Sequence, residues 1–180
     1  TNNDANGIES GHVRVYAFDA TSSDWDQMGA DIDGEAADDQ SGVSVSLSSD
    51  GNIVAIGARY NDANGSNSGH VRVYTFDASS SQWNQMGSDI DGEAADDNSG
   101  YSVSLSSDGN IVAIGARYND ANGLDSGHVR LYTFDASSSE WNQIGPDIVG
   151  EAADDQAGYS VSLSSDGNIV AIGAPYNDGN

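Results

Sequence analysis

The residues best suited to chemistry are carboxylates that crowd into a short acidic segment, residues 31–39. Five carboxylates in nine residues could ligate calcium, a cation that takes 6–8 oxygen ligands. The segment recurs at 89–97 with every acid kept, and at 147–155 with Val149 in place of one. The alternative is an acidic rim of turn-capping aspartates, since the spacing is not the 12-residue loop of an EF-hand. The candidate calcium ligands are Asp31, Asp33, Glu35, Asp38, Asp39, Asp89, Asp91, Glu93, Asp96, Asp97, Glu151, Asp154 and Asp155.

A second oxygen-rich loop spans residues 120–125 and contains an Asn-Gly pair. Metal binding is one interpretation, and a simple turn is the other, because Asn-Gly favours turns. The equivalent loop near residue 64 carries the one N-x-S/T sequon of the chain, Asn64-Gly65-Ser66.

Histidine and arginine alternate on one face of a predicted strand, as in His128 and Arg130. We expect them to pair with loop aspartates across an interface between strand units, rather than to bind a ligand. A single repeated histidine does not by itself make a metal cluster. Tryptophans recur too, and they either stack sugars at an outer rim or pack between neighbouring units. These candidate ligand-binding residues are Trp25, Trp83 and Trp141.

Four predicted strands must position these groups. Residues 101–105 alternate large apolar residues with serine, which is typical of a strand. An Asp-Gly turn then leads to the strand 111–116, which is apolar on both faces and should be buried on both. A third strand is predicted over 128–134 and a short fourth one around 141–144. A meander with two apolar faces cannot stand alone in water, so it must stack on copies of itself.

The copies are visible in the sequence as a repeat of period 58. Residues 3–60 match 61–118 at 49 of 58 positions, so the two blocks must adopt the same structure. A third copy covers 119–176, and the chain 1–180 is one array. We predict an all-β fold of four-stranded antiparallel β-propeller blades, circularly offset with a split terminal blade. The predicted blades cover approximately 42–99 and 100–157, with half-blades at 1–41 and 158–180.

The repeat resembles the FG-GAP repeat of integrin α-subunit-like propellers. The resemblance rests on Gly158-Tyr159-Ser160-Val161 followed by Ile172-Gly173-Ala174, and this pattern returns in each copy. It implies extracellular or cell-surface recognition modules, and a calcium loop between the first two strands. Residues 48–52 occupy that place but hold a single carboxylate, too few for calcium.

The net charge of −24 excludes nucleic acid and anionic membranes as partners. No apolar stretch approaches the length of a membrane span, so membrane insertion is excluded too. Partners are therefore expected to be glycans, surface proteins, or the chain itself. Half-blades expose unpaired edges that would self-associate or join a continuation of the same chain.

The sequence contains no nucleophile elbow, P-loop, dinucleotide fingerprint or zinc signature. An active site needs one asymmetric constellation, whereas near-identical copies suit binding or building. We therefore expect no enzyme, but a non-enzymatic structural or adhesive module of a surface appendage, matrix or filament. A carbohydrate-binding, lectin-like propeller with one site per blade is the alternative. These patterns require no cofactor, and calcium is the one candidate.

Overall fold

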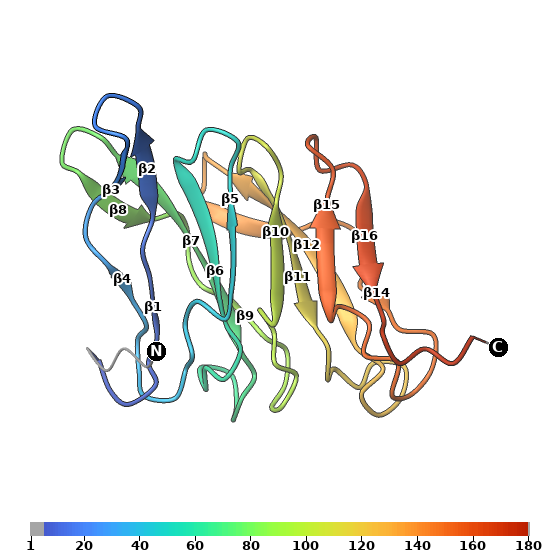
Figure 1. Ribbon diagram of the computed structural model, residues 1–180. Coiled ribbons are helices and arrows are strands. Elements are labelled where there is room, and N and C mark those ends of the chain that lie inside the picture. The colour runs from blue at the N-terminus through green and yellow to red at the C-terminus, as the bar shows by residue number, and fades with distance from the viewer. Residues whose placement is uncertain (1–5, 180) are drawn as a thin grey trace.

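The computed structural model describes residues 6–179, and these residues form strands and turns without a helix. All strand pairs are antiparallel, so the predicted all-β class is confirmed. Small sheets stand side by side like propeller blades, with the N-terminal strands at one end and β15 and β16 at the other (Figure 1).

The two central sheets have five strands each. In both, the first four strands follow a meander, and a two-residue fifth strand pairs with the third. The first sheet contains β5 (Ser44–Leu47), β6 (Ile53–Ala58), β7 (His70–Asp77), β8 (Gln82–Gln85) and β9 (Ile90–Asp91). The second contains β10 (Ser102–Leu105), β11 (Ile111–Ala116), β12 (His128–Asp135), β13 (Glu140–Gln143) and β14 (Ile148–Val149).

Two-stranded sheets flank this pair. At the N-terminal end, β1 (His12–Val13) pairs with β4 (Ile32–Asp33), and β2 (Tyr16–Asp19) pairs with β3 (Asp24–Gln27). At the C-terminal end, β15 (Ser160–Leu163) pairs with β16 (Val170–Gly173). The N-terminal strands are therefore equivalent to β7, β8 and β9, and the C-terminal ones to β10 and β11.

The fifth strand of each central sheet was not expected from the sequence, which indicated a loop there. In β9, pairing with the start of β7 takes Ile90 out of water from between two acidic residues, whereas the equivalent Ile148 of β14 stays 41% exposed. Ile90 pairs with Val71 and is 5% exposed. Each acidic segment therefore begins with a short strand and continues as a turn.

The core lies between the sheets. On β6, Val54 and Ile56 pack toward the N-terminal strands, while Ala55 packs toward the second sheet. This burial on both faces agrees with the continuous apolar run of the strand. Stacking decides the exposure of equivalent residues: Val103 on β10 is 8% exposed because β5 and β6 cover it, whereas Val45 on β5 is 53% exposed.

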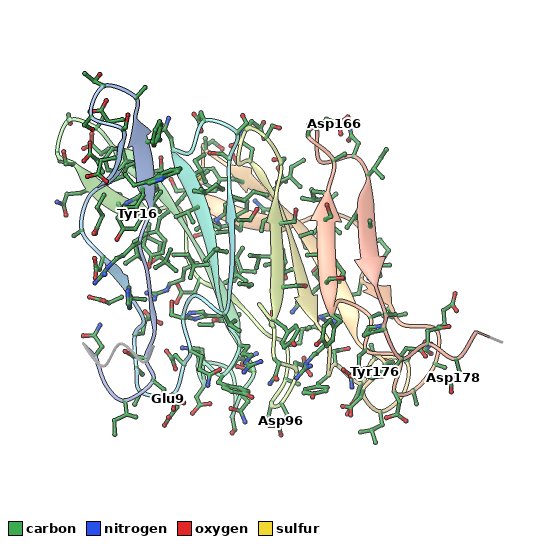
Figure 2. The ribbon with its side chains drawn as sticks, in the orientation of Figure 1. Glu9, Tyr16, Asp96, Asp166, Tyr176 and Asp178 are labelled. Atoms are coloured by element: carbon green, nitrogen blue, oxygen red, sulfur yellow. The ribbon has the colours of Figure 1, made fainter. Side chains whose placement is uncertain are left out.

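Much of the excess of aspartate over glutamate consists of residues that accept hydrogen bonds within turns. Asp166 lies at the tip of the β15–β16 hairpin (Figure 2), where it accepts hydrogen bonds from the Ser164 hydroxyl and the Asn168 amide. These bonds lower the pKa of Asp166 to about 2, and the Ser48 hydroxyl does the same for the pKa of Asp50. The carboxylates replace missing backbone partners in each Asp-Gly turn.

A row of arginine and tyrosine side chains joins one sheet to the next. The guanidinium carbon of Arg117 lies 4.0 Å from the ring centre of Tyr101 and 5.4 Å from that of Tyr159. The equivalent arginine, Arg59, donates two hydrogen bonds to the Gln40 side-chain oxygen. At the position equivalent to Gln40 stands Asn98, which is one methylene shorter, and the buried Nε of Arg117 has no hydrogen-bond partner in the described chain.

We expect Asn98→Gln to raise the free energy of unfolding by about 1 kcal/mol, because it gives Arg117 the acceptor that Arg59 already has. Gln40→Asn is the matched control and should lower that free energy by a similar amount. Urea unfolding of the two variants and the wild type measures both. If Asn98→Gln and Gln40→Asn destabilised the protein equally, the longer side chain would not be supplying a missing acceptor to Arg117.

Candidate functional site

A histidine and two carboxylates meet where the N-terminal strands pack against the first five-stranded sheet. His70 opens β7, Glu35 follows β4, and Asp89 precedes β9. The His70 Nδ1 atom lies 3.9 Å from Glu35 Oε2 and 3.7 Å from Asp89 Oδ2. One ligand atom from each residue lies within 4.8 Å of the others, so the three could hold a metal ion.

The same arrangement recurs 58 residues later, between the two five-stranded sheets. Here the His128 Nδ1 atom lies 3.8 Å from Glu93 Oε2 and 3.7 Å from Asp147 Oδ2. We call the two groups the inter-sheet clusters: Glu35, His70 and Asp89; and Glu93, His128 and Asp147. Each takes its glutamate from one copy of the repeat and its histidine and aspartate from the next.

An arginine beside each histidine holds the glutamate in place. Arg72 is buried, and its guanidinium lies 3.2 Å from the second carboxylate oxygen of Glu35 while also donating to the Asp33 backbone oxygen. Arg130 and Glu93 repeat the ion pair at 3.3 Å. Because Arg72 occupies Oε1, the other oxygen of Glu35 is the one turned toward the histidine.

The two histidines are uncharged at neutral pH. Burial, and secondarily the positive charge of Arg130, lower the pKa of His128 to about 4, although Asp147 opposes the shift. Burial and Arg72 likewise lower the pKa of His70. Both side chains are 1% exposed, and neither Nδ1 atom has a hydrogen-bond partner within residues 6–179. Since buried polar atoms are normally paired, these two require an explanation.

Some carboxylates of the predicted acidic segments belong to the inter-sheet clusters, and others accept hydrogen bonds elsewhere. Glu35, Asp89 and Glu93 belong to the clusters. The neighbouring Asp39 is buried and instead accepts hydrogen bonds from the Ala36 amide and the Asn61 side chain. The structure therefore does not bring the carboxylates of one segment together around a single point.

The remaining predicted ligands have separate partners or turn positions. Asp31 pairs with Arg14 at 2.8 Å. Asp97 and Asp155 repeat the contacts of Asp39, with Asn119 and Asn177. Asp96 accepts from Asn67, and Glu151 accepts from Asn177 at 3.3 Å. The others lie on a short strand or at a turn, some with positive φ: Asp33, Asp38, Asp91 and Asp154.

The second oxygen-rich loop is held as a turn. The Asp120 carboxylate accepts from the Asp125 amide, and the Asn122 side chain donates to the backbone oxygens of Gly150 and Glu151. Asn64 of the sequon makes the same two bonds, with Gly92 and Glu93.

Two of the three tryptophans join adjacent copies. The indole N–H groups of Trp83 and Trp141 donate to the backbone oxygens of Met28 and Met86, both at 2.7 Å. Trp25 is 62% exposed, and its indole N–H has no hydrogen bond within the described residues.

The expected partners of the histidine and arginine were loop aspartates from across the interface. The carboxylate that comes from the neighbouring copy is instead a glutamate, Glu35 or Glu93, whereas Asp89 and Asp147 belong to the same copy as the histidine. One signal was available. Glutamate is rare in this chain, yet Glu35, Glu93 and Glu151 recur at a fixed position amid a large excess of aspartate.

Solved structures share this fold at low sequence identity. A proposed 6-phosphogluconolactonase from Bacteroides fragilis aligns with a TM-score of 0.57 and 12% identity over 92% of this chain and 37% of its own. A second, from Bacteroides uniformis, aligns with a TM-score of 0.58 and 12% identity over 91% of this chain and 41% of its own. The chain therefore spans about two fifths of these structures.

This likeness corrects the expectation of a non-enzymatic module, whether structural, adhesive or carbohydrate-binding, and with it the exclusion of an enzyme. The fold is one found in proteins described as lactonases. The expectation assumed that repetition precludes an active site. Stacking weakens that premise, because it places groups from two different copies together and creates an asymmetric cluster at two of the interfaces between sheets.

No curated protein matches the chain in sequence. Within residues 6–179, the structure contains no helix long and apolar enough to cross a membrane. The FG-GAP repeat model matches residues 31–76 and 89–133. These stretches cover half of the sequence, and they contain β5, β6, β10 and β11 together with most of β7 and β12. The chain therefore belongs to the FG-GAP repeat family.

Proposed function

We propose that this chain is part of an exported β-propeller hydrolase that opens uncharged sugar lactones at the inter-sheet clusters. The observation that carries the proposal is the meeting of two solvent-accessible carboxylates with a buried histidine and arginine, in a fold shared with proposed lactonases.

The clusters contain groups suited to lactone hydrolysis. Glu35 is 44% exposed and Asp89 is 29% exposed, so these carboxylates are the members that reach water and substrate. A carboxylate can take a proton from water as the water oxygen bonds to the lactone carbonyl carbon. The ring C–O bond then breaks, and the departing oxygen takes up the proton. Arg72 orients Glu35, and the positive charge of its guanidinium favours the negative charge that develops on the carbonyl oxygen.

Charge restricts the substrate. With a net charge of −24, the protein repels anions, so a phosphorylated lactone should associate slowly. The named activity of the solved structures concerns a phosphorylated sugar, and we propose that this chain favours the uncharged equivalent.

The proposed architecture is a ring to which this chain contributes two blades, 42–99 and 100–157, and two half-blades. The half-blades would be completed by further copies, either in the same chain or in another. Support comes from the exposed apolar residues at the two ends, including Val45 and Leu47 at one end and Ile169 at the other. Self-association through these ends is part of the proposal.

We expect the protein to hydrolyse glucono-δ-lactone above its spontaneous rate, with a lower kcat/KM for the 6-phosphorylated lactone. The double variant Glu35→Gln/Glu93→Gln should lose at least about 100-fold of this excess rate, because it removes the more exposed carboxylate of each inter-sheet cluster, the one that Arg72 or Arg130 orients. Acid release followed with a pH indicator measures each rate. Glu140→Gln, which changes a carboxylate on β13 outside the clusters, is the control and should be unchanged.

Two results would overturn the proposal. One is the absence of any excess rate in the wild-type protein. The other is an excess rate that Glu35→Gln/Glu93→Gln leaves unchanged, since hydrolysis would then occur elsewhere.

A further inference from the structure

We infer that each inter-sheet cluster binds a divalent transition-metal cation of the zinc type, with histidine, glutamate and aspartate as its three protein ligands. The inference rests on the geometry of the clusters and not on the proposed hydrolysis. With the metal bound, Glu35 and Asp89 would hold it, and a metal-bound water would replace the water that a free carboxylate activates.

A histidine nitrogen in each cluster is left unpaired. The Nδ1 atoms of His70 and His128 are buried, lack a hydrogen-bond partner in the described chain, and face two carboxylates across a gap too long for a hydrogen bond. A cation between the three side chains would satisfy the nitrogen and both oxygens at once. The arrangement occurs twice with distances that agree within 0.1 Å.

The separations between the ligand atoms are close to those of a tetrahedral zinc site. Zinc binds nitrogen and oxygen ligands at roughly 2.0–2.2 Å in a tetrahedron, which places two ligand atoms about 3.3 Å apart. The observed separations from Nδ1 are 3.7 and 3.9 Å for the first cluster. Movements of a few tenths of an ångström would therefore bring Nδ1 to tetrahedral spacing from both oxygens, which lie within 4.8 Å of each other. Three protein ligands leave the fourth position to water, as in catalytic zinc sites.

The ligand atoms suit a transition metal better than calcium. Calcium takes 6–8 oxygens, whereas these clusters offer one imidazole nitrogen and two carboxylates. Imidazole suits zinc, copper, iron and nickel, and it binds metals through an unprotonated nitrogen. The clusters therefore favour a transition metal over the calcium expected from the acidic segments alone.

The charges around each site also favour a cation. Two carboxylates balance the double charge of the metal, and the net charge of −24 attracts cations to the protein. Arg72 opposes the metal by its own charge, but it is paired with the far oxygen of Glu35. It thereby fixes the near oxygen toward His70, as outer-shell partners of metal ligands do.

The chain provides its own control for stoichiometry. It has three equivalent histidines, His12, His70 and His128, but only the last two meet a glutamate and an aspartate among residues 6–179. We therefore expect two metal ions per monomeric chain, and a third only where another copy brings a glutamate to His12.

The test is calorimetric titration of the metal-free protein with Zn²⁺, and with Co²⁺ followed by visible absorption. Two equivalents of Zn²⁺ should bind, and Co²⁺ should give the intense bands of a tetrahedral site. His70→Gln should leave one equivalent, and His70→Gln/His128→Gln should leave none. His12→Gln should still bind two. Ca²⁺ should give no binding that depends on His70 or His128.

Glu35→Gln provides a second route if a histidine variant does not fold, and it should also leave one equivalent. An unchanged stoichiometry in both His70→Gln and Glu35→Gln would overturn the inference. For the monomeric chain, an equal loss in His12→Gln would overturn it too. Because the readout is binding, two bound metal ions without lactone hydrolysis would reject the proposed function and leave this inference standing.

Discussion

Gly57→Ala is expected to lower the free energy of unfolding by about 3 kcal/mol or more. Gly57 lies on β6, and an added Cβ would overlap the backbone oxygen of Gly100 in the next sheet as well as the Ser44 side chain. The Ser44 hydroxyl donates to that same backbone oxygen at 2.7 Å, so the sheets are joined at this point. A backbone atom cannot rotate away as a side chain can, and the sheets would have to separate.

Gly51→Ala is the matched control for Gly57→Ala. Gly51 has a φ of +73° and nothing within 4 Å of an added Cβ, so the change introduces backbone strain without a collision. It should cost about 1–2 kcal/mol, the penalty of a left-handed conformation for a residue with a side chain. Urea unfolding compares the two. Equal losses would show that close approach of the sheets at Gly57 contributes little.

Trp141→Ala is expected to cost about 2–3 kcal/mol of unfolding free energy, somewhat below the value for a fully buried tryptophan. The side chain is half-buried against the core between the sheets, and its loss also leaves the Met86 backbone oxygen without the indole donor. Trp141→Phe separates these effects, because it keeps most of the apolar contact and should cost about 1 kcal/mol for the lost hydrogen bond.

Trp25→Ala is the internal control for Trp141→Ala. Trp25 occupies the equivalent position but is 62% exposed, so its removal should change stability by less than about 0.5 kcal/mol. Thermal unfolding of the three variants measures the contrast. If Trp25→Ala and Trp141→Ala destabilised the protein equally, the contact between neighbouring copies would not be the source of the effect.

The strands themselves could be derived from the sequence. The alternation of serine with large apolar residues predicted β10, and the apolar run with its Asp-Gly turn predicted β11 at the observed residues 111–116. Period-2 alternation and turn residues are local signals, so they survive in a sequence read alone. The short strands β9 and β14 were missed because two residues carry no periodicity. Their pairing depends on the start of β7 and β12, which lies far away in sequence.

The repeat, the resemblance to the FG-GAP family and the position of His70 and Arg72 on one face of a strand could also be derived from the sequence. Tertiary structure alone decided the partners of these residues. Glu35, His70 and Asp89 are separated by 35 and 19 positions, and no local pattern states that they meet. They meet because each sheet is apolar on both faces, and these faces are buried only when the sheet stacks on the next copy. That stacking turns single histidines into clusters, and it leaves Trp25 exposed where Trp83 and Trp141 are held between copies.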